Sequence, residues 1–194
     1  MTTNDDQHYI NQVLDGNTQA FAILVDRYKN LVFTLALRMV KDREEAEEVS
    51  QDTFIKVYKK LNKFKGESKF STWIYKVTYN TCLDRIKTYK KKYNTVEIDE
   101  YTAHHVKTTT TAYDTLVEQE QSQQLRNCID LLPSEDSFLL SLFYFEEQSL
   151  EEIAKVIGIT ANNVKVKLYR SRKKLANILK DNLEPEILAS YGRQ

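Results

Sequence analysis

The sequence contains very little glycine and proline, with four Gly and two Pro among 194 residues. Because these two residues interrupt helices most strongly, their scarcity indicates a mostly helical protein. No run of about 18 apolar residues occurs, so we expect no membrane insertion, and the start MTTNDDQHYI lacks the pattern of a secretory signal. Cys82 and Cys128 have no metal-ligand spacing, which predicts reduced, buried thiols in a cytoplasmic protein.

Motifs for catalysis are also missing from the sequence. There is no phosphate-binding glycine loop, no nucleophile motif and no cluster of metal ligands. His104 and His105 are adjacent, but a metal site would need more ligands nearby, so we interpret them as a solvated pair. We therefore predict no enzyme activity, no cofactor and no metal.

The net charge is zero, but charges of each sign are concentrated in blocks. Residues 56–92 contain twelve Lys and Arg and two acids, whereas residues 160–180 contain seven Lys and Arg and no acid. Residues 41–52 carry six acids and residues 118–152 carry nine. The two basic blocks suggest two contacts with a polyanion, and the acidic blocks suggest a basic protein partner or mutual shielding.

The clearest local motif is SLEEIAKVIGITANNVKVKLYRSRKKLANILK, residues 149–180. Ser149 and Glu152 have the spacing of a capping box, and Gly158 stands where the first helix must end. Thr160 can cap a second, strongly basic helix. The pattern predicts a helix-turn-helix whose second helix enters the DNA major groove. The alternative is an amphipathic helix with a solvated basic face.

A second candidate surface lies on the acidic helix predicted to begin after Asp42. Asp42 can cap this helix together with Glu45. Phe54, Ile55 and Tyr58 cannot all point inward along with the core stripe of the same helix. This favours a protein-docking face, and the alternative is an ordinary solvated surface.

The loop KFKGESKFST, residues 63–72, interrupts the helical pattern at Gly66. Ser71 can cap a further helix that runs to about Lys91, on which aromatic residues are interleaved with Lys, Arg and Asn. Such a pattern suits single-stranded nucleic acid, because bases stack on rings while cations follow the backbone. For any single tyrosine here, partial burial is the alternative.

The predicted fold class is all-α, with two small helical domains joined by a flexible linker. Residues 1–92 form the first domain, and residues 113–182 form the second, which contains the helix-turn-helix. Residues 93–112 are Thr-rich without periodicity, which predicts the linker, and residues 183–194 form a C-terminal tail. In isolation, the two domains can pack together through their opposite charges.

The stretches DREEAEEVSQDTFIKVYKKLNKFKGESKFSTWIYKVTYNTCLDRIK (42–87) and LLPSEDSFLLSLFYFEEQSLEEIAKVIGITANNVKVKLYRSRKKL (131–175) resemble bacterial RNA polymerase sigma factors. The resemblance is to the small extracytoplasmic-function (ECF) type, from about Gly16 to Leu179 without the linker. It implies a promoter-specificity subunit that binds core RNA polymerase, recognises −10 and −35 promoter DNA and promotes strand opening. It also implies region 2 and region 4 as the two domains.

The resemblance assigns three groups of residues. The group expected to bind the coiled coil of the largest polymerase subunit is Glu45, Glu48, Gln51, Asp52, Phe54, Ile55 and Tyr58. The group expected to bind the melted −10 element is Lys63, Lys65, Gly66, Glu67, Ser68, Lys69, Phe70, Ser71, Thr72, Trp73, Lys76, Tyr79, Asn80, Arg85 and Lys87. The group expected to bind the duplex −35 element is Thr160, Asn162, Asn163, Lys165, Val166, Lys167, Tyr169, Arg170, Arg172 and Lys173.

Further partners implied by the resemblance are an anti-sigma factor or another targeting protein. A sigma factor would work in the cytoplasm, associated with the nucleoid. The alternative function is a stand-alone helix-turn-helix transcription regulator. That alternative explains residues 113–180 but leaves the acidic helix and the KFKGESKFSTW segment without a role.

Overall fold

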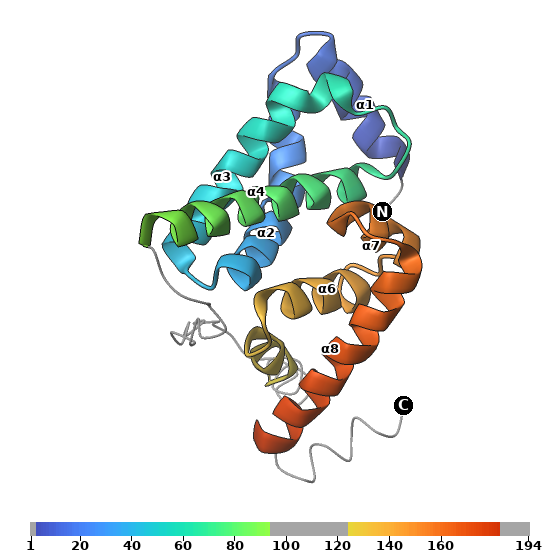
Figure 1. The fold of residues 1–194 in the computed structure, drawn as a ribbon. Helices are drawn as coiled ribbons and strands as arrows, with labels where there is room; N and C mark the ends of the chain where they lie inside the picture. Colours follow the sequence, from blue (N-terminus) through green and yellow to red (C-terminus); the bar gives the residue numbers. More distant parts are fainter. Residues whose placement is uncertain (1–2, 94–123, 183–194) are drawn as a thin grey trace, which may run out of the picture.

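The structure, a computed structural model, describes residues 3–93 and 124–182, and all regular elements within these ranges are helical (Figure 1). The N-terminal half consists of α1 (Thr3–Leu14), α2 (Gln19–Val40), α3 (Arg43–Lys60), the short 3-10 helix η1 (Leu61–Lys63) and α4 (Phe70–Tyr93). The C-terminal half consists of a helical segment at 124–130, α6 (Ser134–Tyr144), α7 (Leu150–Ile157) and α8 (Ala161–Asn182). The predicted all-α class is confirmed. The predicted tail and, apart from the end of α4, the predicted linker lie outside the described residues.

The helix boundaries follow from local capping. The Ser149 hydroxyl accepts from the Glu152 N–H while the Glu152 carboxylate accepts from the Ser149 N–H, so the predicted capping box is present. Gly158 ends α7 with a left-handed φ of 77°. Asp42 caps α3 as expected. The prediction that Ser71 caps the next helix is wrong, because the Lys69 carbonyl already accepts from the Trp73 N–H and α4 begins at Phe70.

The N-terminal half is organised around α2, on which α1, α3 and α4 pack. The buried stripe of α2 includes Leu24, Val32, Leu35 and Met39, which repeat at helical spacing. Lys41 caps the end of the helix with a left-handed φ of 60°, and its N–H donates to the Leu37 carbonyl. The chain therefore turns sharply into α3, which runs back along α2.

The two halves lie against each other, with α4 between them (Figure 1). One side of α4 packs on α2 and α3, and another side packs on α7, while α6 packs on α2. The Tyr79 and Phe138 rings meet across this contact with centroids 5.1 Å apart. Buried apolar residues from both halves thus form one connected core. The contact is apolar as well as charged, so opposite charge alone does not explain it.

Among residues 3–93 and 124–182, no helix combines the length and the apolar character that crossing a membrane requires.

Candidate nucleic-acid interface

One side of the basic helix α8 packs against the rest of the protein, and the opposite side, which we call its front, is exposed to solvent. Val164, Leu168 and Leu175 are buried, and α8 packs on α6 and α7. Thr160 caps the helix, its hydroxyl accepting from the Asn163 N–H at 3.3 Å. The residues expected to read duplex DNA are largely exposed, namely Thr160, Asn162, Asn163, Lys165, Val166, Lys167, Tyr169, Arg170, Arg172 and Lys173. Tyr169, at 65% exposure, is the most exposed large hydrophobic side chain in the described part of the chain.

Two of these basic side chains already have partners on α6. Lys167 Nζ lies 2.8 Å from Glu135, and the Arg172 guanidinium lies over the rings of Phe143 and Tyr144 at 5.1 and 5.3 Å. The sequence places acids on α6, but it does not indicate which lysine each acid meets. Lys167 and Arg172 are therefore held in place by the protein itself, whereas the part of the chain that the structure describes offers Lys165 no ion pair.

The outer face of α3 combines an apolar groove with acidic residues. Phe21, Phe54, Ile55 and Tyr58 line the groove, and the Tyr58 and Phe21 rings meet edge to face at 5.0 Å. Ile55 is 50% exposed and Tyr58 is 45% exposed. The other residues expected on this face, Glu45, Glu48, Gln51 and Asp52, are exposed except for the half-buried Glu45. The arrangement suits a partner that offers both apolar and basic side chains.

Arg85 lies on a different side of α4 from the one predicted. The sequence pattern places it with the nucleic-acid-binding side chains, but its guanidinium pairs with Glu45 at 3.1 Å and also with Glu48. Both carboxylates belong to α3, so Arg85 joins α3 to α4. Burial works to lower the pKa of Arg85, but the hydrogen bond to Glu48 and the nearby acids outweigh it and raise that pKa.

The loop between η1 and α4 is anchored by an aromatic cluster. Phe70 is buried and packs against Phe64 and Trp73, with ring centroids 5.4 and 5.6 Å away. The Tyr28 ring of α2 also meets the Phe70 ring, with centroids 5.6 Å apart. Gly66, with φ of 72°, provides the tight bend. The polar residues of the loop that remain exposed are Lys63, Lys65, Glu67 and Lys69, and Ser68 and Ser71 are half-buried.

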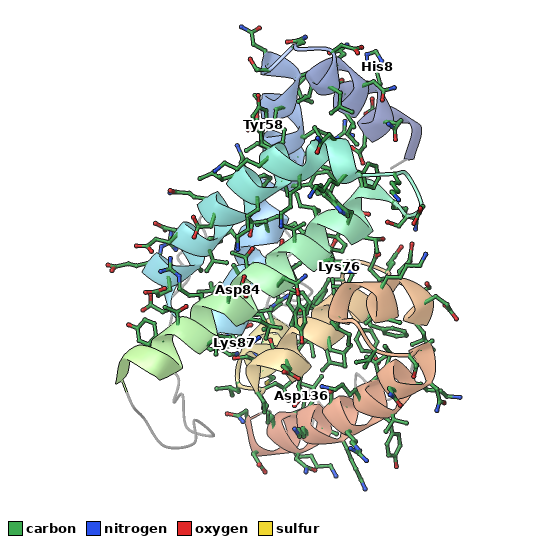
Figure 2. The ribbon with its side chains drawn as sticks, turned by 45° about the horizontal axis from the view of Figure 1, so that its top comes forward. His8, Tyr58, Lys76, Asp84, Lys87 and Asp136 are labelled. Carbon is green, nitrogen blue, oxygen red and sulfur yellow. The ribbon has the colours of Figure 1, made fainter. Side chains whose placement is uncertain are left out.

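The residues of α4 expected to contact melted DNA fall into two groups. Lys76, Asn80 and Lys87 are exposed, and Figure 2 shows Lys76 and Lys87 along the helix. Thr72 and Tyr79, in contrast, are only 2% and 9% exposed. Lys69 and the residues Thr72, Tyr75 and Tyr79 that follow it at helical spacing make up what we call the α4 face.

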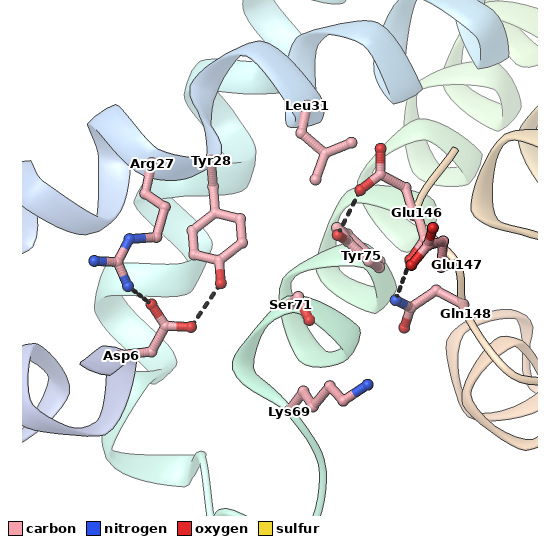
Figure 3. A pocket seen from close by; sticks show the side chains of 10 residues that line it. All are labelled: Asp6, Arg27, Tyr28, Leu31, Lys69, Ser71, Tyr75, Glu146, Glu147 and Gln148. Atoms are coloured by element: carbon pink, nitrogen blue, oxygen red, sulfur yellow. Dashed lines mark hydrogen bonds and ion pairs between the residues drawn. The ribbon is translucent and has the colours of Figure 1, made fainter. Parts of the chain in front are cut away.

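Residues 146–152, the acidic corner between α6 and α7, contact Lys69, Thr72 and Tyr75 of the α4 face, whereas Tyr79 packs on Phe138 of α6 and Lys69 stays exposed. Thr72 Oγ1 lies 3.2 Å from Gln148 Oε1, the Tyr75 hydroxyl donates to Glu146 at 3.0 Å, and Lys69 pairs with Glu152 at 3.0 Å. Figure 3 shows Lys69, Tyr75, Glu146 and Gln148 at a cavity of about 380 Å³ that α1 and α2 also line. Sequence reasoning missed Tyr75 and the acidic corner, whose only sequence signal is an excess of acids.

Burial and charge change the pKa values at this contact. Burial raises the pKa of Glu146, although the Tyr75 hydroxyl and Arg38 act against it. Burial also raises the pKa of Tyr79 to about 12. For Glu152, partial burial works upward, but hydrogen bonds from the Ser149 N–H and Lys69 outweigh it and lower the pKa. The contact therefore holds polar groups that have lost part of their water.

A second polar cluster joins the halves at the C-terminal end of α2. Arg38 is 8% exposed and donates to Asp130 at 3.2 Å and to Ser141 at 2.6 Å. Its guanidinium also lies 5.2 Å from the centre of the Phe145 ring. Lys41 donates to the Asp130 carbonyl at 2.6 Å, and burial lowers the pKa of Lys41 to about 8. We call the contact between the two halves the seam. The cluster at residues 146–152 and the cluster around Arg38 hold the seam at two separate places.

Comparison with known proteins gives a consistent result. The family model for Sigma-70 region 2 matches residues 24–92, and the model for Sigma-70, region 4 matches residues 122–175. The ECF RNA polymerase sigma factor SigW of Bacillus subtilis is 33% identical over 179 residues, which is 89% of this chain and 95% of that protein. The RNA polymerase sigma-H factor of Pseudomonas aeruginosa is 28% identical over 185 residues, 92% and 96% of the two chains.

Solved structures share the fold. The structure of CnrH in complex with the cytosolic domain of CnrY matches with a TM-score of 0.64 at 20% identity, over 92% of this chain and 99% of that one. The sigma factor RpoE in complex with the anti-sigma factor NepR from Bartonella quintana also gives a TM-score of 0.64, at 19% identity, over 84% and 98%.

Proposed function

Because this chain belongs to the sigma-70 family, as a member of the ECF type, we propose that three of its faces each make one of the contacts needed for promoter recognition. A sigma factor is the promoter-specificity subunit of bacterial RNA polymerase. It binds the core enzyme, recognises −10 and −35 promoter DNA and promotes strand opening, and it is not itself an enzyme. The stand-alone regulator is not favoured, because the region 2 match covers the acidic helix and the loop that a regulator leaves without a role.

The outer face of α3 is our candidate for the surface that binds core polymerase, at a coiled coil of the largest subunit. The observation that carries this assignment is the exposed apolar groove at Ile55 and Tyr58, with Glu48, Gln51 and Asp52 exposed on the same helix. A contiguous exposed apolar patch, unlike a single exposed apolar side chain, marks an interaction site. The acids add attraction for a basic partner and speed its association.

The loop at 63–69 and α4 are our candidates for the −10 site. Lys63 and Lys65 are exposed on the loop, and Lys76, Asn80 and Lys87 are exposed on the helix. Cations that follow a backbone, next to aromatic rings that can receive a base, fit a melted strand. Arg85, which pairs with α3, is assigned to positioning α4 and not to DNA contact.

The exposed front of α8 is our candidate for the −35 site. Its N-terminal residues Asn162, Asn163 and Lys165 would lie at base edges, and Tyr169, Arg170 and Lys173 toward later bases and phosphates. The units would be residues 1–92 and 113–182, joined by 93–112. The protein would act in the cytoplasm at the nucleoid, and its further partners would be an anti-sigma factor or another protein that targets it to promoters.

The test is capture of the protein by bacterial core RNA polymerase. We expect the double variant Ile55→Ala/Tyr58→Ala to lose binding by about tenfold or more, since each buried anchor of an interface contributes roughly 1–2 kcal/mol. The matched control is Ile23→Ala, which removes an apolar side chain that is 41% exposed on α2 outside the groove. Equal capture of the double variant and the control would remove the groove from the polymerase interface.

A further inference from the structure

The loop at 63–69 is anchored near its two ends and not along its length. Phe64 near its start and Phe70 just after it meet through their rings, with centroids 5.4 Å apart. Within the described part of the chain, no hydrogen bond between backbone groups joins residues 65–68 to another element. The shape in which this loop meets DNA therefore depends on how firmly Phe64 and Phe70 are held.

Tyr28 of α2 supports Phe70 while it borders a cavity. The Tyr28 and Phe70 rings lie with centroids 5.6 Å apart, and Tyr28 is only 8% exposed. Tyr28 also lines the cavity of about 380 Å³, together with Lys69 and Ser71 next to the loop (Figure 3). Atoms that border a cavity lack packing partners on that side. Packing alone therefore does not fix the direction of the Tyr28 ring.

The direction of the Tyr28 side chain is fixed from α1, by Asp6. The Tyr28 hydroxyl donates to one carboxylate oxygen of Asp6 at 2.6 Å, and the other oxygen accepts from Arg27. The Asp6 side chain is 13% exposed. Burial, together with the bond to Asp6, raises the pKa of Tyr28, so the hydroxyl stays protonated and able to donate. A hydrogen bond to a charged acceptor is stronger than a neutral one, so Asp6 determines where the tip of Tyr28 lies.

The helix that carries Asp6 also lies next to the loop. Besides α2, α1 contacts η1 and α4, the two elements that the loop connects. The side-chain oxygen of Gln7 is 4.0 Å from the position that a Cβ on Gly66 would take. The region 2 match begins at residue 24, so it does not include α1. The loop thus has a support that is outside the matched region.

We propose that Asp6 is a positioning residue for −10 recognition: through the Tyr28 hydroxyl it holds Tyr28 against Phe70, and so it fixes the shape in which the 63–69 loop receives the melted strand. This inference rests on the −10 role proposed for the loop. Asp6 itself touches no DNA in this account and acts only through Tyr28 and Phe70.

The consequence is for selectivity more than for affinity. Lysine contacts with phosphates carry no sequence information, and the long lysine side chain tolerates a small displacement of the loop. A base that is taken out of the stack is read by a pocket, which depends on accurate placement of its walls. Loss of the Asp6 bond should therefore weaken the base preference at the −10 element while most of the binding remains.

The experiment uses the full chain as holoenzyme with core RNA polymerase, and a pool of duplex promoter DNA in which the −10 and −35 elements are both randomised. Sequencing the retained DNA gives the base preference at each element. For Asp6→Ala we expect the −10 preference to fall at least about fivefold, the lower end of the usual range for coupled sites. The −35 preference should stay as in the wild type, since α8 belongs to the other half of the chain.

The matched control is Asp5→Ala. Asp5 pairs with the same Arg27, but its side chain is 54% exposed and the Tyr28 hydroxyl donates to Asp6 instead. Tyr28→Phe is a second variant, which keeps the ring on Phe70 and removes only the hydroxyl. It should lower the −10 preference as well. Asp6→Ala added to Tyr28→Phe should lower that preference little further, because both changes remove one and the same bond.

Trp73, the single tryptophan of the chain, reports on the loop anchor in the free protein. Its ring centroid lies 5.6 Å from that of Phe70 and 5.5 Å from that of Phe64, and Trp73 is half-buried. In Asp6→Ala, acrylamide should quench the Trp73 fluorescence more strongly than in the wild type, because a loosened Phe70 exposes the indole. Asp5→Ala should be quenched as the wild type is.

Three results would overturn the inference: an unchanged −10 preference in Asp6→Ala, equal losses in Asp6→Ala and Asp5→Ala, or equal losses at the −10 and −35 elements, which would indicate general damage to the fold. Lys63→Ala/Lys65→Ala tests the proposed function separately and should lower retention of the pool. If it does not, the −10 role of the loop fails. If it does while Asp6→Ala keeps the −10 preference, that role stands and only the positioning by Asp6 fails.

Discussion

On α8 the side chains proposed to read DNA point outward, whereas Thr72, Tyr75 and Tyr79 of the α4 face lie beneath the chain's own C-terminal half. Tyr169 is 65% exposed and Tyr79 is 9% exposed. Both helices carry tyrosines among basic residues, so composition does not separate them. The difference comes from what packs nearby: within residues 3–93 and 124–182, α8 packs on α6 and α7, while α4 lies between α2, α3 and α7. Whether the side chains of an aromatic and basic helix are exposed or buried in the seam therefore depends on the elements that pack next to that helix.

The sharpest test of this comparison is the stability of the seam itself. Phe138 is fully buried and its ring meets Tyr79, so Phe138→Ala should lower the free energy of unfolding by about 3–5 kcal/mol. Tyr169→Ala, on the exposed side of α8, should change it by less than about 0.5 kcal/mol. Urea denaturation followed by circular dichroism measures both. Similar losses for the two variants would mean that the seam is not a core.

A smaller effect is expected at the other end of the seam. Arg38→Ala removes hydrogen bonds to Asp130 and Ser141 from a side chain that is 8% exposed. Hydrogen bonds to charged groups contribute about 1.5–3 kcal/mol, so we expect a loss near 2 kcal/mol in the same denaturation measurement.

The control for Arg38 is Arg43→Ala. Arg43 pairs with Glu47 on the surface of α3, where its side chain is 63% exposed. Surface pairs contribute about 0–1 kcal/mol, so this change should be nearly neutral. A loss for Arg43→Ala equal to that for Arg38→Ala would contradict the idea that the buried guanidinium joins the halves.

Much of the fold could be predicted because its signals are local. The capping box at Ser149 and Glu152, the cap at Asp42 and the left-handed Gly158 each depend on residues close in sequence, and each is present. Apolar spacing likewise indicates the buried stripe of α2. The all-α class and the helix-turn-helix follow from such patterns.

The seam could not be predicted because its partners lie far apart in the sequence. Thr72 meets Gln148 and Tyr75 meets Glu146, more than sixty residues later. The helical pattern of α4 allows Tyr79 to face either solvent or protein, since a tyrosine suits both. Arg85 was assigned to the wrong side of α4 because charge alone does not reveal that Glu45 and Glu48 lie next to it.

The exposed helix offers the finest prediction, because two of its exposed lysines differ in whether an acid of the described chain pairs with them. Lys165 and Lys167 are both exposed on α8, but Lys167 pairs with Glu135 at 2.8 Å. A cation that is free to bind a phosphate releases counterions from DNA, so Lys165→Ala should reduce the slope of log affinity against log salt by about 1. Lys167→Ala should reduce it less, because binding DNA first requires breaking the pair with Glu135.

The measurement is fluorescence anisotropy of holoenzyme on duplex promoter DNA over a series of salt concentrations. Glu135→Gln is the matched variant, since it frees Lys167 without removing it, and it should raise affinity at low salt. If Lys165→Ala and Lys167→Ala changed the slope equally, and Glu135→Gln changed nothing, then the pairing with α6 would not govern which lysines of α8 meet DNA. The contrast between side chains that are free to bind DNA and side chains that are already paired within the protein would then apply to α4 alone.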